Sequence, residues 1–305
     1  MGSSHSWRSS KVADLLASEI EPITFVPNPG NAGDALINLG TYHLLQALGI
    51  EWSTIPAHAL PQLPAHDLIV LGGGGGLVPE WDGTAAHVAW AIERARRVVL
   101  LPQTVAGHDE TLRSLRPEDV LFVRELSSYE YCRRLGLKCL VELDHDVALN
   151  VDLSRLEARM RLRDVFDHAP PWRRLSWLRL AQVTKHRILG GGLRELEAFR
   201  IDAESLQTGR RRTWMNDVSL TGTVHSGSLD ESETVSARFL ALIDRYGRVA
   251  TDRLHVTIGA VLLGKKVTAY DNINGKVSGV VNYSRLPVDL KEPRKPSGDG
   301  SDALS

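Results

Sequence analysis

The first half of the chain alternates short apolar runs with segments of helical periodicity. The run at 23–26 precedes a turn-rich loop, PNPGNAGD, and then ALINLGTYHLLQALG, whose apolar positions repeat with helical spacing. The same succession continues through DLIVLGGGGG (67–76), AAHVAWAIERAR, RVVLLPQTV (97–105), VLFVREL (120–126), SSYEYCRRLG and KCLVELDHDVAL (138–149). Short buried strands that alternate with helices predict a parallel sheet covered on both faces.

The alternation resumes near residue 195 and predicts a second α/β domain. Its segments are LEAFRIDAES (196–205), DVSLTGTV (217–224), ETVSARFLALIDRYG (233–247), VATDRLH, HVTIGAVLLG and KVTAYDN (266–272). We therefore expect an α/β protein with one domain over 20–150, a connector over 151–194 and a second domain over 195–286. Residues 287–305 are rich in Pro, Gly, Ser and charge, which predicts a disordered tail.

Basic side chains dominate the connector. Cations outnumber the four acids between 151 and 194, and those up to residue 190 are Arg155, Arg159, Arg161, Arg163, Arg173, Arg174, Arg179, Lys185 and Arg187. Such a charge run is usually the solvated face of helices, here a pair that bridges two domains. Trp172 and Trp177 lie among these cations, a combination that also suits an anionic membrane surface. A peripheral membrane contact through 155–190 is therefore the alternative.

Composition narrows the functional classes. The 305 residues are 43% hydrophobic and carry a formal net charge of −1, so no global field favours nucleic acid. The two cysteines, Cys132 and Cys139, are too few for a disulfide framework, and no Cys/His spacing indicates a metal site. No apolar stretch has the length of a signal peptide core or a membrane span. We expect a cytoplasmic protein, at most peripheral at the inner face of the membrane.

Two glycine-containing loops are candidate ligand sites. In PNPGNAGD, Gly30 would allow close backbone approach, Asn31 stands between glycines, and Asp34 can cap the next helix. A capped turn without a ligand accounts equally well for Asp34. The run of five glycines at 72–76 follows a buried strand, so a ligand near Gly73 and Gly74 is expected. It matches neither the dinucleotide fingerprint nor a Walker loop.

Charged residues occur where later strands give way to helices. Arg253 and His255 lie between VAT and an apolar helix, and Arg124 ends another strand. Ligands of open α/β sheets bind at such strand ends. A guanidinium group matches phosphate or carboxylate, and an imidazole transfers protons near neutral pH. A capping or otherwise satisfied His255 is the competing interpretation. Lys276, in NINGKVSG, would add a cation, although a loop lysine is usually just solvated.

Several of these stretches together resemble the polysaccharide pyruvyltransferase family. The matching segments are GNAGDALI (30–37), LIVLGGGGGLV (68–78), LLPQTV (100–105), FVRELSSYEY (122–131), HDVAL (145–149), FRIDAES (199–205), TDRLHVTIGAVLLGKKV (251–267) and DNINGKVSG (271–279). The resemblance implies two Rossmann-like domains facing each other in a glycosyltransferase B-like arrangement. It also implies transfer of pyruvate from phosphoenolpyruvate to two hydroxyls of a sugar, which forms a cyclic ketal. The basic connector has no counterpart in the family.

The resemblance, taken with the residues, assigns roles to the candidate positions. In the family the Arg-Leu-His stretch and an arginine of the first half are associated with the donor. We therefore expect His255 and Arg253 to be catalytic, and the donor to contact Arg124, Leu254, Gly73, Gly74 and Lys276. The acceptor or loop positions are Gly30, Asn31, Asp34 and Gln103.

The expected ligands are phosphoenolpyruvate and a saccharide or lipid-linked saccharide, without metal, further cofactor or nucleic acid. Two other functions stay open. A glycosyltransferase of the B type that uses a nucleotide sugar would share the two-domain layout and the glycine loop. A non-catalytic scaffold of a membrane complex would use the basic connector.

Overall fold

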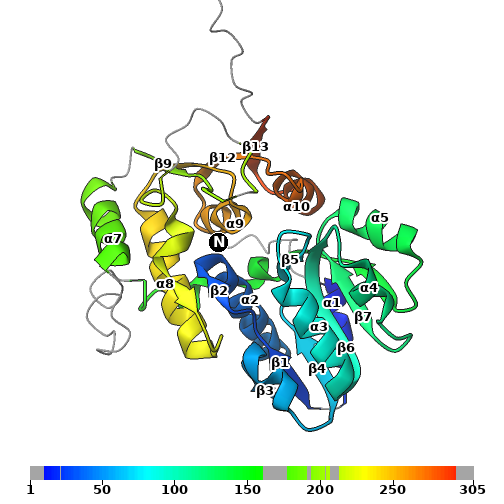
Figure 1. Ribbon diagram of the computed structural model, residues 1–305. Helices are drawn as coiled ribbons and strands as arrows, with labels where there is room; N and C mark the ends of the chain where they lie inside the picture. The colour runs from blue at the N-terminus through cyan, green and yellow to red at the C-terminus, as the bar shows by residue number, and fades with distance from the viewer. Residues whose placement is uncertain are drawn as a thin grey trace, which may run out of the picture.

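Two parallel β-sheets, each flanked by helices, form the framework of the protein (Figure 1). The computed structural model describes residues 10–20, 22–160, 177–190, 194–202, 204–206 and 213–292. These sheets and their flanking helices confirm the expected α/β fold with a parallel sheet covered by helices.

The larger sheet contains seven parallel strands in the order β3-β1-β4-β6-β7-β8, with β5 pairing along the far end of β6. The strands are β1 (Ile23–Val26), β3 (Trp52–Thr54), β4 (His66–Leu71), β5 (Gly74–Leu77), β6 (Ala95–Val105), β7 (Val120–Val123) and β8 (Leu140–Leu143). Both faces are apolar. Val70 and Val99 contribute to one hydrophobic cluster, whereas their neighbours Ile69 and Leu100 contribute to another.

Helices cover both faces of this sheet. On one face lie α1 (Ser10–Ser18) and α2 (Ala32–Leu48), and on the other α3 (Gly83–Arg94), α4 (Asp109–Arg113) and α5 (Leu126–Leu135). Helix α1 begins ten residues before the expected start of the domain, and its Val12 and Leu16 are fully buried in the core. Helix α2 ends at Gly49, which takes the left-handed conformation with φ 67° that a glycine adopts without steric cost.

The smaller sheet has four parallel strands in the order β13-β12-β11-β9. They are β9 (Glu195–Ala198), β11 (Arg248–Thr251), β12 (Lys266–Tyr270) and β13 (Val288–Lys291), and the helices of this half are α7 (Trp177–Leu189), α8 (Leu229–Asp244), α9 (Leu254–Leu262) and α10 (Lys276–Ser284). The expectation of disorder from residue 287 was wrong for β13, because Val288 and Leu290 pack against the core while the strand pairs with β12. Residues 293–305 lie outside the described part.

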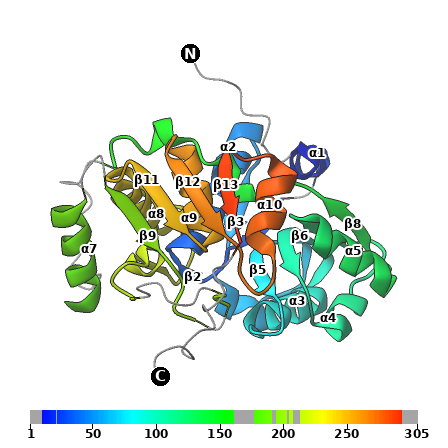
Figure 2. The ribbon, with the colours of Figure 1, turned by 90° about the horizontal axis from the view of Figure 1, so that it is seen from above.

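The two halves are joined by packing rather than by a simple hinge. Helix α2 of the first half packs along α8 of the second, and both supply one continuous hydrophobic cluster (Figure 1). A two-stranded antiparallel sheet also links them, formed by β2 (Gly30–Asn31) and β10 (Thr223–Val224). Seen from above, β9, β11 and β12 lie on one side and β6 and β8 on the other, with β5 and α10 between them (Figure 2). This arrangement brings the glycine loops next to the second half.

The expected connector is described over 151–160 and 177–190. A short 3-10 turn, η2 (Val147–Asn150), comes immediately before it. The connector itself contains a second turn, η3 (Leu153–Arg155), and later helix α7. Arg159 forms ion pairs with Asp230 at 3.1 Å and Glu233 at 2.9 Å, which fixes this part against the start of α8. Trp172 and the cations at 161–176 lie outside the described residues. Within the described part, no helix is long and apolar enough to cross a bilayer.

Candidate functional site

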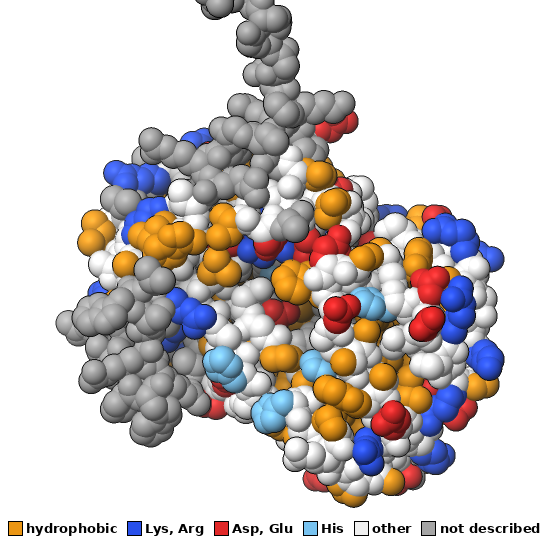
Figure 3. Space-filling model, in the orientation of Figure 1, with side chains coloured by type: hydrophobic (Ala, Val, Ile, Leu, Met, Phe, Trp, Pro, Cys, Tyr) orange, Lys and Arg blue, Asp and Glu red, His pale blue; other side chains and the backbone are white. Residues whose placement is uncertain are grey.

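A cavity of about 420 Å³ opens between the two halves, beyond the carboxyl ends of the strands. The space-filling view shows a hollow there, with acidic and basic side chains along its upper margin (Figure 3). Its walls come from the loops after β1, β4 and β9 and from the first residues of α9 and α10. Parallel α/β sheets place ligands at this edge because helix N-termini and loop amides point there.

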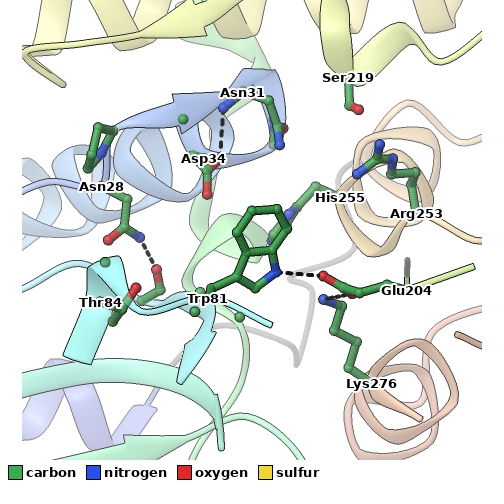
Figure 4. Close-up of a pocket in the computed structure, with 18 of the residues that line it drawn as sticks. Asn28, Asn31, Asp34, Trp81, Thr84, Glu204, Ser219, Arg253, His255 and Lys276 are labelled. Carbon is green, nitrogen blue, oxygen red and sulfur yellow. Dashed lines mark hydrogen bonds and ion pairs between the residues drawn. The ribbon is translucent and has the colours of Figure 1, made fainter. Parts of the chain in front are cut away.

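The first glycine loop forms one wall and caps α2. Asn31 accepts a hydrogen bond from the Gly33 amide at 2.7 Å, and Asp34 accepts one from the Asn31 amide at 2.8 Å. This reciprocal capping box accounts for the expected turn. Gly30 has φ 150°, and a Cβ there would lie 2.1 Å from Asp34 Oδ2, so a side chain is excluded. The Asp34 carboxylate, which accepts the bond from the Asn31 amide through Oδ2, also lines the cavity (Figure 4).

The protonation of Asp34 is perturbed by its surroundings. Burial raises the pKa of this carboxyl, against the opposing effect of His255, the Asn31 amide, Lys276 and Arg124. A buried carboxyl with a raised pKa binds a proton more readily than an exposed aspartate does. Asp34 thus lines the cavity as well as capping the helix.

The run of five glycines leaves room for two cations. A Cβ at Gly75 would lie 2.9 Å from Arg124 Nη2 and 3.3 Å from Lys276 Nζ. The glycine backbone thus lies directly against a guanidinium and an ammonium group. Gly73 and Gly74 also line the cavity, where Asn28 donates a hydrogen bond from its amide nitrogen to the Gly73 carbonyl. The close approach expected from the sequence is between this loop and basic side chains of both halves.

Gln103 supports the glycine loop from below. Its Nε2 donates a 2.6 Å hydrogen bond to the Gly72 carbonyl, and the side chain is 1% exposed. Its Oε1 has no hydrogen-bond partner among the described residues. Gln103 lines the cavity, but most of its surface is covered by the loop that it holds.

Among the residues that the structure describes, Arg124 is the largest fully buried side chain, and it directly follows β7. Its Nη1 donates to Asp146 Oδ2 at 2.7 Å, and its Nε donates to Thr104 at 3.0 Å. Burial alone would raise the pKa of Asp146, but Arg124 and His255 more than offset this and hold it far below its usual range. Asp146 is consequently ionised, and it fixes the guanidinium with Nη2 toward Gly75.

His255 lies in the first turn of α9, where the expected crevice-facing position is realised. Its Nε2 is 3.5 Å from both Asp146 Oδ2 and Arg124 Nη1, and its side chain is 17% exposed. Its Nδ1 faces the first turn of α2, because a Cβ at Gly33 would lie 2.9 Å from that atom. The imidazole, which belongs to the second half, therefore lies against α2, Arg124 and Asp146 of the first half, at the wall of the cavity.

Arg253 also lines the cavity, but carboxylates already occupy its guanidinium group. It donates to Asp217 from Nε at 3.0 Å and again from Nη2, and it lies 3.3 Å from Asp202. The adjacent Leu254, which was expected to contact the donor, is 3% exposed within the hydrophobic core and does not line the cavity. Within the Arg-Leu-His stretch, His255 and Arg253 both line the cavity, and the Arg253 guanidinium is held there by two carboxylates through Nε and Nη2.

Lys276 is buried at the start of α10 and reaches the glycine loop. Its ammonium donates to Glu204 Oε2, which also accepts from Asn272 Nδ2 at 2.9 Å, while Glu204 Oε1 is 2.9 Å from Arg200. Burial lowers the pKa of Lys276 to about 8, despite the opposing effect of Glu204. The lysine that could have been an exposed loop residue is instead part of the wall.

Several lining residues were missed by the sequence analysis. They are Asn28, Trp81, Thr84, His87, Arg200, Asp202, Glu204 and Ser219. The sequence did offer one signal for these residues, the tryptophan Trp81 a few positions after the glycine run. Among the described residues, no group of three or more His, Cys, Asp or Glu side chains is arranged to hold a metal ion.

The geometry suits a small anion beside a proton-transfer group. Arg124 and Lys276 offer two cationic donors at one point of the loop, and His255 and Asp34 are two groups able to exchange protons next to them. The two cations and the imidazole line one cavity, with Arg124 Nη1 3.5 Å from His255 Nε2.

The chain is similar to known proteins over most of its length. Residues 31–274 match the sequence model of the polysaccharide pyruvyl transferase family. The chain is also similar to the crystal structure of an uncharacterized protein from Klebsiella pneumoniae, with 25% identity, a TM-score of 0.66, and coverage of 93% of this chain and 95% of that one. No curated protein matches the chain.

Proposed function

The chain belongs to the polysaccharide pyruvyl transferase family, and from this membership we propose that it moves pyruvate from phosphoenolpyruvate onto two hydroxyls of a saccharide. The product is a cyclic ketal. The observation that carries the proposal is the meeting of Arg124, Lys276 and His255 at Gly75 and Gly33, from opposite halves of the molecule. Two facing sheets with the site between them are consistent with a glycosyltransferase B-like arrangement.

Donor binding follows from the two cations. Phosphoenolpyruvate carries a carboxylate and a phosphate on a three-carbon frame, so it needs two cationic contacts a short distance apart. Arg124 presents a planar fork and Lys276 a point charge, and both lie close to the same point, the Cα of Gly75. The N-terminus of α2, beside His255, adds a partial positive charge. Arg253 orients this wall through Asp217 and contacts the donor at its periphery.

Proton transfer is assigned to His255 and Asp34. Protonated His255 gives its proton to the methylene carbon, and the first hydroxyl attacks the adjacent carbon while Asp34 accepts the hydroxyl proton. The bond from that carbon to the phosphate oxygen then breaks, and the second hydroxyl closes the ring. Of the two hydroxyl protons, one replaces the proton that became part of the methyl group, and the other leaves with phosphate. The cations compensate the charge that moves onto phosphate.

The remaining elements of the proposal concern location and acceptor. Cys132 and Cys139 are both buried and unpaired, as is usual in a reducing compartment, which supports a cytoplasmic protein. The acceptor is a hexose of a surface polysaccharide or a lipid-linked precursor. The basic segment 155–190 would bring a lipid-linked acceptor near through peripheral contact with anionic lipid.

A mass measurement tests the function directly. The protein is incubated with phosphoenolpyruvate and a panel of galactosyl, glucosyl and mannosyl acceptors, and the products are weighed. We expect one acceptor to gain the mass of a pyruvyl ketal with release of one phosphate. Stabilisation of the protein by nucleotide sugars but not by phosphoenolpyruvate, without any ketal product, would instead support the glycosyltransferase alternative.

A further inference from the structure

An indole ring stands in the middle of the cavity, in front of the reactive side chains (Figure 4). Trp81 comes from the loop between β5 and α3, and 49% of its surface is exposed. Its backbone is held in place, because its carbonyl lies 2.9 Å from His108 Nε2 and its amide donates to the Val78 carbonyl at 3.0 Å. The ring is thus exposed without being loosely attached.

The polar atom of this side chain is already used. Trp81 Nε1 donates a 2.9 Å hydrogen bond to Glu204 Oε1, which belongs to the other half of the molecule. A ligand in the cavity can therefore meet only the faces and edge of the ring. The face of an aromatic ring carries partial negative charge, so it disfavours a carboxylate or phosphate and favours C–H groups.

The residues on the side of the ring away from Glu204 are polar but uncharged. Asn28 and Thr84 lie on the same side of the cavity, away from Lys276 (Figure 4). His87 lines this side too, and burial lowers its pKa, so it is neutral near pH 7. The Asn28 backbone amide donates to Asn38 Oδ1 at 3.0 Å, and the Asn28 carbonyl accepts from Asn38 Nδ2 at 2.9 Å. These two bonds hold this part of the wall in place. The cavity therefore has charged groups around Lys276 on one side of the ring and a neutral wall on the other (Figure 4).

We propose that Trp81 is the platform of the acceptor subsite, on which an uncharged pyranose stacks its C–H-rich face beside Asn28, Thr84 and His87. The two hydroxyls to be linked then point inward toward His255. This inference rests on the proposed function and adds the placement and the chemical class of the acceptor. A sugar ring combines an apolar face with hydroxyls at its edge, which is the combination that this wall matches.

The bond from Trp81 to Glu204 fixes the angle of the platform. Glu204 also holds Lys276, so the ring on the acceptor side and the cation on the donor side share one anchor. Removing the ring and removing only its N–H group therefore have different consequences. Trp81→Ala removes the platform, whereas Trp81→Phe keeps an aromatic face but gives up the bond to Glu204.

The experiment measures donor and acceptor affinity separately in the full-length protein. Phosphoenolpyruvate is titrated alone, and methyl glycosides of galactose, glucose and mannose are titrated by calorimetry and used as substrates. Trp81→Ala should weaken binding of the preferred glycoside about tenfold, which corresponds to about 1.4 kcal/mol, and leave donor affinity within about twofold. Trp81→Phe should retain most of the acceptor affinity. Leu140→Ala, at a 51% exposed position on β8 far from the cavity, is the matched control.

The outcomes separate this inference from the proposed function. Unchanged glycoside affinity in Trp81→Ala overturns the platform, as does an equal loss of donor and acceptor affinity. Equal effects of Trp81→Ala and Trp81→Phe would mean that the bond to Glu204 matters rather than the ring face, and would also overturn it. Failure of the wild-type protein to bind phosphoenolpyruvate, with glycoside binding that still depends on Trp81, rejects the pyruvyl donor while retaining a sugar site.

Discussion

Donor affinity is expected to fall above about pH 8, because Lys276 loses its charge there. Burial lowers the pKa of this ammonium to about 8, so the group is charged below that pH and neutral above it. The second pKa of a phosphate group lies near 6, so the donor keeps the same charge across this range. Any change in affinity near pH 8 therefore reports on the protein.

The size of the effect follows from the contact that is lost. A hydrogen bond to a charged group contributes about 1.5 to 3 kcal/mol, which is roughly a 10- to 150-fold change in the KM for phosphoenolpyruvate. Lys276→Met should raise that KM by such a factor at neutral pH. Glu204 keeps Arg200, Asn272 and Trp81 as partners in this variant, so the fold should survive.

The assay is the initial rate of phosphate release, with phosphoenolpyruvate varied at each pH on both sides of 8. The wild-type KM should rise with pH, by up to about tenfold per unit once Lys276 is mostly neutral. In Lys276→Arg the cation persists throughout, because a guanidinium group does not titrate in this range. A flat wild-type profile, or a rise of the same size in Lys276→Arg, would refute the reasoning.

Three further substitutions test other parts of the site. His255→Ala should lower phosphate release at least about 100-fold with little change in thermal stability, and unchanged turnover would remove the imidazole from the mechanism. Gly75→Ala should raise the KM for phosphoenolpyruvate, because the added Cβ would lie 2.9 Å from Arg124 Nη2. The control is Gly83→Ala, whose Cβ would meet nothing within 4 Å and which should leave this KM unchanged. Arg253→Lys should lower the free energy of unfolding by about 1 to 3 kcal/mol in denaturant titrations, because one ammonium cannot reproduce the paired contacts to Asp217; an unchanged midpoint would contradict this.

The order of strands and helices followed from local patterns. The apolar run at 67–71 and the helical spacing after Asp34 require only short-range information, and both elements occur where they were expected as β4 and α2. The tail was misjudged because composition alone does not reveal a partner. Val288–Lys291 becomes a strand because β12 offers a free edge, and nothing within four residues specifies that edge.

The sequence by itself determined which loops line the cavity, because glycines, a capping box and charged residues at strand ends are features of adjacent positions. It indicated Arg124, His255 and Lys276 as separate candidates in three such loops. Only the tertiary structure decided that Arg124 and Lys276 meet at one glycine run with His255 beside Arg124. It also decided that Arg253 is engaged by two carboxylates and that Trp81 is tied to Glu204. The bonds from Arg253 to Asp217, Trp81 to Glu204 and Arg124 to His255 join positions 36, 123 and 131 residues apart. Their geometry depends on how α2 packs along α8 and on how the two sheets face each other, which no local pattern encodes.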